Sequence, residues 1–146
     1  MAKNRGKTRI AKPLPVLKAG SRVPVASEPA PGKLRFSFRF LTITQKFDPA
    51  HCGAAYAGAL LLRLKALEQT ATTDFVTQID RKGLRSHPID FAEPRVSEDG
   101  WGDDRLPEGR PWQFSVSANE HGRVHGILTG DVFYVIWIDP LHRLFP

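Results

Sequence analysis

The chain has one cysteine, Cys52, among its 146 residues. A single thiol excludes a disulfide within the chain and a zinc site built from several cysteines. Nothing in this composition calls for an oxidising compartment, so we expect a cytoplasmic protein. No apolar run approaches the roughly 18 residues of a membrane-spanning helix. The first residues also lack the apolar core of a secretory signal, so we expect no contact with a membrane.

Positive charge is concentrated at the N-terminus. Residues 1–33 hold eight lysines and arginines against one acid, whereas residues 34–146 hold 13 against 14. The basic side chains that lead the chain are Lys3, Arg5, Lys7, Arg9 and Lys12. Such an excess favours a polyanionic partner, above all RNA or DNA, because neutralised phosphates release counterions. A solubilising leader, or a start codon placed too early, would give the same composition.

The chain divides into two parts near residue 33. Five prolines fall within residues 1–33, where apolar periodicity is almost absent. We therefore predict a basic, proline-rich, flexible tail over residues 1–33. Residues 34–146 are predicted to form a single domain, because their number is typical of one hydrophobic core.

The first half of the predicted domain holds one strand and two helices. Apolar side chains alternate over residues 34–44, which predicts a half-buried strand whose length and aromatic content favour a central position. A helix is predicted over residues 48–69, because an Asp-Pro pair opens it and leucines recur at helical spacing. A second, short helix is expected from about Thr72 to Gly83.

The second half is predicted to be a connection followed by three strands. Residues 84–111 have no clear period and read as a long loop with room for one short element. Strands are predicted over residues 113–118, 123–128 and 132–138, with a turn at 119–122 and a two-residue hairpin at Gly130-Asp131. The last strand is apolar on both faces and should be central. The element order predicts the α+β class: an antiparallel sheet, ending in a three-stranded meander, with both helices on one face.

Residues 112–146 resemble the C-terminal part of the RelE/YoeB superfamily of bacterial toxins, and the topology of residues 34–146 agrees with the same family. The features that carry the resemblance are an aromatic-rich strand, a turn, an acidic hairpin, an apolar strand and a terminal histidine. They correspond here to Trp112 to Ser117, Glu120-His121-Gly122-Arg123, Gly130-Asp131, Val132 to Ile138, and His142 close to Phe145. The sequence departs from the family pattern at Gly122, which is inserted, and at Phe145, which replaces a tyrosine.

The resemblance implies an endoribonuclease that needs no metal or cofactor and cleaves mRNA, on the ribosome, by attack of the ribose 2′-hydroxyl. It implies a toxin of a toxin–antitoxin or phage-defence module, with RNA or the ribosome and a cognate antitoxin as partners. Arg123 would stabilise the phosphate, and His142 would be the general acid. The general base would be a glutamate before the meander, with Glu108 the nearest candidate and Glu93 and Glu98 as alternatives.

Four further residues are candidates for this site. Glu120 lies in the turn, where polar residues are expected in any case. His125 lies in mid-strand on the face of Arg123, where a hydrogen-bonded structural histidine is the alternative. Arg143 would contact RNA together with the cations of the tail. His87 can reach the meander from the long loop.

Two other functions fit the same sequence. The domain would serve equally as a non-catalytic RNA- or protein-binding accessory subunit of a defence or mobile-element system. A ribosomal or nucleoprotein component, anchored through the basic tail, is the third hypothesis.

Overall fold

A computed structural model of the chain describes residues 32–78, 83–118 and 120–146. The five leading cations of the tail, Lys3, Arg5, Lys7, Arg9 and Lys12, lie outside the described residues. Their part in RNA binding therefore stays a prediction.

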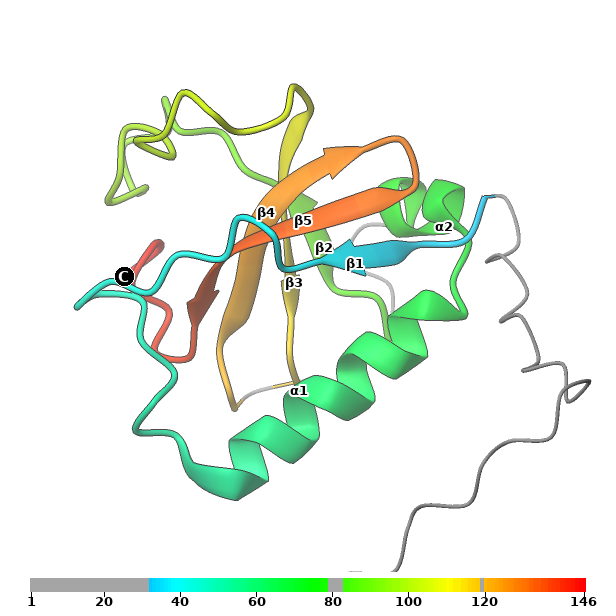
Figure 1. The fold of residues 1–146 in the computed structure, drawn as a ribbon, viewed down its shortest axis with the longest axis horizontal. Helices are drawn as coiled ribbons and strands as arrows, with labels where there is room; N and C mark the ends of the chain where they lie inside the picture. The colour runs from blue at the N-terminus through cyan, green and yellow to red at the C-terminus, as the bar shows by residue number, and fades with distance from the viewer. Residues whose placement is uncertain (1–31, 79–82, 119) are drawn as a thin grey trace, which may run out of the picture.

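The described residues form one sheet of five strands and two helices (Figure 1). Their order is β1 (Arg35–Ser37), α1 (Gly53–Glu68), α2 (Thr72–Thr77), β2 (Ser86–Pro88), β3 (Arg110–Ser115), β4 (Arg123–Thr129) and β5 (Val132–Asp139). The strands lie in the sheet in the order β1-β5-β4-β3-β2. The predicted α+β class is confirmed.

The sheet is mixed, so the prediction of a wholly antiparallel sheet is wrong. β1 runs parallel to β5, with Arg35 opposite Val132 and Ser37 opposite Tyr134. The pairs β2–β3, β3–β4 and β4–β5 are antiparallel. The helices carry the chain from β1 on one edge to β2 on the other, and β5 then lies beside β1. Alternating hydrophobicity specifies which face of a strand is buried, but not the direction of its partner.

The first strand is short and lies at an edge, whereas a long central strand was predicted over residues 34–44. Leu34 is buried and Phe36 packs against Phe114 and Phe133, as the alternation predicts. The chain then leaves the sheet, and the amide of Leu41 donates to the carbonyl of Phe38 at 3.0 Å. Phe38, one residue beyond the end of β1, is 46% exposed. The alternation of apolar side chains in the sequence therefore extends beyond the three residues that pair with β5.

Both helices differ from their predicted bounds. Asp48, the predicted cap, accepts the amide hydrogen bond of Ala50 at 2.8 Å and closes a turn ahead of α1, which begins at Gly53. The second helix ends at Thr77 and not at Gly83. The short element expected in the long connection is β2, at its beginning.

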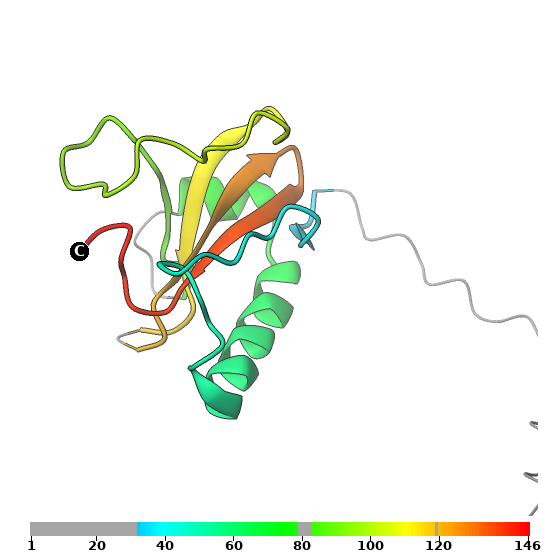
Figure 2. The same cartoon turned by 60° about the vertical axis from the view of Figure 1, so that its left-hand side comes forward.

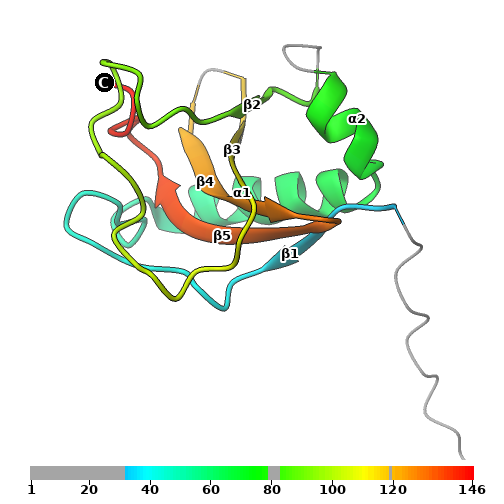
Figure 3. The same ribbon diagram turned by 90° about the horizontal axis from the view of Figure 1, so that it is seen from above.

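The two faces of the sheet are covered differently (Figures 2 and 3). One face packs against α1 and α2 through a core cluster that includes Tyr56, Leu67, Phe75, Phe114 and Phe133. The other face packs against irregular segments through Phe47, Ile89, Ile127, Ile136, Trp137 and Leu144. The rings of Phe47 and Trp101 lie 4.6 Å and 4.8 Å from that of Trp137. The long connection and the C-terminal segment therefore form a second layer, and the polar residues considered next lie beside it.

Candidate functional site

A row of polar side chains crosses the face of the sheet that is turned away from the helices. His87 on β2 lies opposite Gln113 on β3, which lies opposite His125 on β4. In the next row, Arg123 lies between Ser115 and Asp139. Residues directly opposite one another project to the same face, and their chain neighbours Phe114 and Val124 belong to the helix-covered core.

A hollow of about 280 Å³ opens at one end of these rows. Its lining residues, the cationic pocket, are Arg85, His87, Ser115, Ser117, Ala118, Arg123 and His142. The pocket brings together Arg123 and His142, the two residues that the resemblance places at the reacting phosphate. It adds Arg85 and His87, and none of its lining residues is acidic. Two guanidinium and two imidazole groups around one hollow are suited to bind a phosphate.

Arg123 is oriented by a buried amide. Its Nη1 donates to Oε1 of Gln113 at 3.2 Å, and Gln113 is only 3% exposed. Arg123 itself is half-buried at the start of β4. A guanidinium held in this way loses little further side-chain entropy when it binds an anion.

Arg85 ties the start of β2 to the turn between β3 and β4. Its Nη1 donates to the carbonyl of Ala118 at 2.5 Å, and its own carbonyl accepts the amide hydrogen bond of Ser115 at 3.1 Å. Its backbone has a φ of +44°, in the left-handed region. His142 shares this conformation at +56°, as does His121 at +59°. Left-handed residues other than glycine store strain and cluster at functional sites, and two of these three line the cationic pocket.

Arg63 of α1 adds a third guanidinium at the edge of the site. It donates to the carbonyl of Ser115 at 2.9 Å, and also to the carbonyls of Gly83 and Leu84. Burial and then the charge of Arg85 lower the pKa of Arg63 below its ordinary value. The side chain of Arg63 is half-buried against the strands. It contributes positive potential beside the pocket.

His125 and Asp139 form a buried pair behind the pocket. Nε2 of His125 lies 3.0 Å from Oδ2 of Asp139, and the side chains are 0% and 1% exposed. A carboxylate only accepts, so Nε2 of His125 carries the proton, and Nδ1 has no partner among the described residues. Burial lowers the pKa of His125, although Asp139 opposes the shift. His125 is thus a neutral, inaccessible histidine that cannot touch a substrate.

The pKa of Asp139 is shifted in the direction that keeps it ionised. Burial alone would raise this pKa. The hydrogen bond from His125 and those from the amides of Leu144 and Arg143 outweigh burial and bring it below its ordinary value. The pair is therefore a carboxylate and a neutral imidazole near neutral pH.

Acid should destabilise the fold through His125. Its folded pKa lies below the unfolded value of 6.5, so the unfolded chain binds the extra proton and stability falls as the pH drops through this value. Below pH 6.5 we expect the free energy of unfolding to fall as the pH decreases, by at most about 1.4 kcal/mol per pH unit for this one group. Urea unfolding across this range measures it. The variant His125→Gln should flatten the slope, and the exposed control His51→Gln should retain it. Equal slopes in all three proteins would contradict the burial of a neutral His125.

The carboxylates proposed as general base do not reach the cationic pocket. Thr129 donates to the carbonyl of Glu108 at 2.6 Å, which places Glu108 at the opposite end of β4 from Arg123. Glu93 pairs with Arg95, and Glu98 pairs with Lys46. His87, and none of these glutamates, lines the cationic pocket.

The remaining candidates, Glu120 and Arg143, do not line the cationic pocket. Glu120 is exposed in the turn, and its backbone bonds to the hydroxyl of Ser117. Nη1 of Arg143 lies 3.5 Å from the carbonyls of Gln45 and Lys46. Arg143 lines a separate hollow of about 290 Å³ together with His51 and Cys52. It does not share the pocket of His142.

Gly122 is required where the turn meets the end of β5. It has a φ of +65°, and an added Cβ would lie 2.0 Å from the carbonyl oxygen of Asp139. We expect Gly122→Ala to lower the free energy of unfolding by about 3 kcal/mol, through backbone strain and overlap. Gly58→Ala, in open space on α1, should instead raise it by about 0.5–1 kcal/mol. Urea unfolding of both variants checks this pair, and a neutral Gly122→Ala would show that the turn can move away.

Within residues 32–78, 83–118 and 120–146, no three histidine, cysteine, aspartate or glutamate side chains cluster as a metal ion requires. Neither helix of the described part is long and apolar enough to span a membrane. Comparisons with family models, curated proteins and solved structures found no match.

Proposed function

We propose that the chain is a metal-independent endoribonuclease that cleaves RNA at the cationic pocket. The observation that carries the proposal is the convergence of Arg85, Arg123, His87 and His142 on one hollow. Phosphodiester cleavage within RNA needs an anion-binding site and two groups that move protons near neutral pH. Arginines supply the first, and histidines are the side chains best suited to the second.

The reaction that suits these groups starts at the ribose. One imidazole takes the proton of the 2′-hydroxyl, and the 2′-oxygen attacks the adjacent phosphorus. The bond from phosphorus to the 5′-oxygen breaks, and that oxygen receives a proton from the other imidazole. The products are a 2′,3′-cyclic phosphate and a 5′-hydroxyl. Arg85 and Arg123 stabilise the charge that develops on the phosphate oxygens. We assign the base to His87 and the acid to His142.

The biological setting follows from the resemblance to RelE/YoeB toxins. A strand and two helices precede the antiparallel strands, and His142 follows the last strand closely, as the resemblance implies. We therefore propose a toxin of a toxin–antitoxin or phage-defence module that acts in the cytoplasm on mRNA, including mRNA on the ribosome. Its proposed partners are the ribosome and a cognate antitoxin.

Cleavage of a synthetic RNA by the full chain, with and without ribosomes, tests this function. The RNA should give 2′,3′-cyclic phosphate ends with a bell-shaped pH profile, and its 2′-deoxy counterpart should stay intact. His87→Ala and His142→Ala should each lower the rate by about 10²–10⁴-fold. Loss of one limb of the pH profile in each variant would assign the base and the acid. Cleavage of the 2′-deoxy RNA would exclude the proposed mechanism.

One observation favours a second candidate, an RNA-binding accessory subunit without catalysis. The lining of the cationic pocket holds no carboxylate, and the predicted glutamates lie elsewhere. Such a pocket would bind phosphate equally well without cutting RNA. Retention of RNA on a filter by a protein that leaves it intact, with or without ribosomes, would select this alternative.

A further inference from the structure

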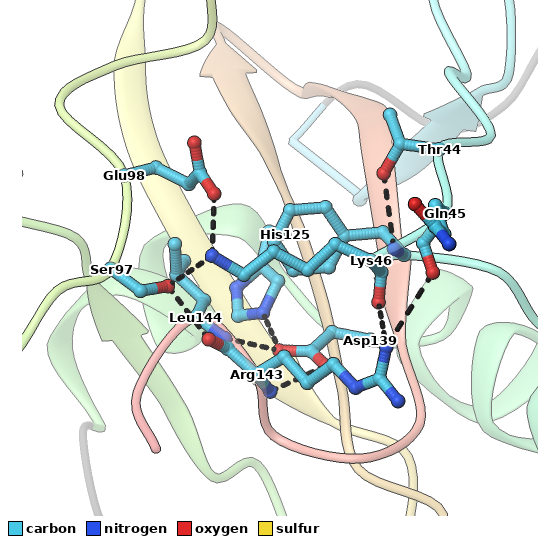
Figure 4. A network of polar contacts seen from close by, with 10 residues as sticks. Thr44, Gln45, Lys46, Ser97, Glu98, His125, Asp139, Arg143 and Leu144 are labelled. Atoms are coloured by element: carbon cyan, nitrogen blue, oxygen red, sulfur yellow. Dashed lines mark hydrogen bonds and ion pairs between the residues drawn. The ribbon is translucent and has the colours of Figure 1, made fainter.

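Asp139 is a buried carboxylate that accepts three hydrogen bonds at the end of β5. Its Oδ1 accepts from the amide of Arg143 at 2.7 Å. Its Oδ2 accepts from the amide of Leu144 at 2.9 Å and from Nε2 of His125 at 3.0 Å (Figure 4). An ionised carboxylate has about four lone-pair sites and no donor, so it suits this cluster of donors, whereas an amide does not.

The turn that Asp139 closes carries His142. The two amides bonded to Asp139 follow His142 directly in the chain, and the amide of His142 lies 3.5 Å from the carbonyl of Asp139. His142 thus occupies the middle of a closed turn, with its φ of +56° fixed by the bonds around it. The imidazole is exposed at the cationic pocket while its backbone is held from behind.

A second set of contacts holds the same turn from the long connection. The hydroxyl of Ser97 donates to the carbonyl of Arg143 at 2.7 Å, and the amide of Ser97 donates to the carbonyl of Leu144 at 2.9 Å. Lys46 joins Ser97 to Glu98 on the solvent side (Figure 4). The side chain of Leu144 is fully buried. Among the hydrogen bonds of residues 32–78, 83–118 and 120–146, those of the Asp139 side chain tie the turn to the sheet that also carries Arg123.

We propose that Asp139 is a positioning residue, whose carboxylate, oriented by His125, holds the turn of residues 140–144 so that His142 faces the cationic pocket. The catalytic consequence rests on the proposed function, but the positioning is a property of the folded chain. His125 fixes the carboxylate from the sheet, and the carboxylate fixes two successive amides. A mobile His142 would lose the orientation that proton transfer to a departing oxygen needs.

The variant Asp139→Asn tests the proposal, because it preserves the shape but replaces one acceptor by a donor. Amide hydrogen exchange of the full chain should show Arg143 and Leu144 protected in the natural protein and at least ten-fold less protected in the variant. The ring signals of His142, followed by NMR during titration with inorganic phosphate, should shift at least several-fold less at saturation in the variant, because the imidazole no longer faces the bound anion. Asp104→Asn, at an exposed position, is the matched control and should change neither readout.

Catalysis provides a separate readout. With RNA as substrate, Asp139→Asn should lower kcat by ten-fold or more and leave KM within about two-fold, because Arg85 and Arg123 still bind the phosphate. A loss of stability alone would not lower kcat while leaving KM unchanged. If the natural chain cleaves no RNA, yet the exchange and phosphate results hold, the proposed function fails and the positioning stands.

Two results would overturn the positioning. One is a folded Asp139→Asn variant whose His142 responds to phosphate as in the natural protein. The other needs no variant: Arg143 and Leu144 amides that exchange as fast as exposed amides in the natural protein would show that Asp139 does not hold the turn. The second measurement decides the question even if Asp139→Asn does not fold.

Discussion

Replacing Arg123 by alanine should lower the rate of RNA cleavage by about 10²–10³-fold, the usual cost of removing one preorganised donor from a developing anion. The guanidinium is already aligned by Gln113, so the substitution removes a group that needs no reorientation on binding. Single-turnover cleavage of a labelled RNA measures the effect. Arg123→Lys should recover only part of the rate, because an ammonium group keeps the charge but not the forked geometry.

The control for this prediction is Arg95→Ala. The side chain of Arg95 is 81% exposed and pairs with Glu93 in the long connection, outside the cationic pocket. Its removal should leave the cleavage rate within about two-fold, because surface pairs of this kind contribute little. Equal losses in both variants would mean that total charge, and not the pocket, determines the rate.

Replacing Asp139 by alanine should lower the free energy of unfolding by about 3–5 kcal/mol, because three donors lose their acceptor and two of them are buried. Urea unfolding at neutral pH measures the change. Asp104→Ala, at an exposed position, should stay within about 0.5 kcal/mol of the natural protein. A loss below about 1 kcal/mol in Asp139→Ala would show that water or a shifted turn satisfies the donors, and that the buried pair is not a structural anchor.

The sequence predicted those parts of the fold that depend on local pattern. The α+β class, the two-residue hairpin at Gly130-Asp131 and the buried character of β5 follow from periodicity and turn residues. The position and direction of β1 do not, because its alternating side chains specify a face and leave the partner open. The second layer formed by the long connection could not be predicted either, because the aromatic residues of this segment have no regular spacing.

Some residues of the candidate site were likewise predicted from the sequence, and others were not. Arg123 and His142 were candidates because of the resemblance to the RelE/YoeB superfamily, and the structure sets both in one pocket. His87 was a candidate able to reach the meander from the long loop, and it lines the pocket. Arg85 was not a candidate, because it lies in the same segment without periodicity. Glu108 was chosen for its position in the sequence, whereas the pairing of β3 with β4 carries it to the far end of the sheet.

Asp139 was not among the candidate residues predicted from the sequence. The signal that was missed is a pair of residues. An acid lies at the end of an apolar strand, and a histidine lies 14 residues before it, in the middle of the preceding strand. A hairpin brings such residues side by side, and a buried carboxylate needs the partners that a histidine and a tight turn provide. Net charge was equally uninformative, because cations gather at the pocket while half of the acids of residues 34–146 lie in the long connection.

The most direct test of RNA cleavage at the cationic pocket is a map of RNA 5′-hydroxyl ends in cells that express the full chain or its His142→Ala variant at equal, soluble levels. New ends within mRNA, accompanied by growth arrest and lost in His142→Ala, are the expected result. The same ends in both proteins, or none from either, would contradict cleavage at this pocket.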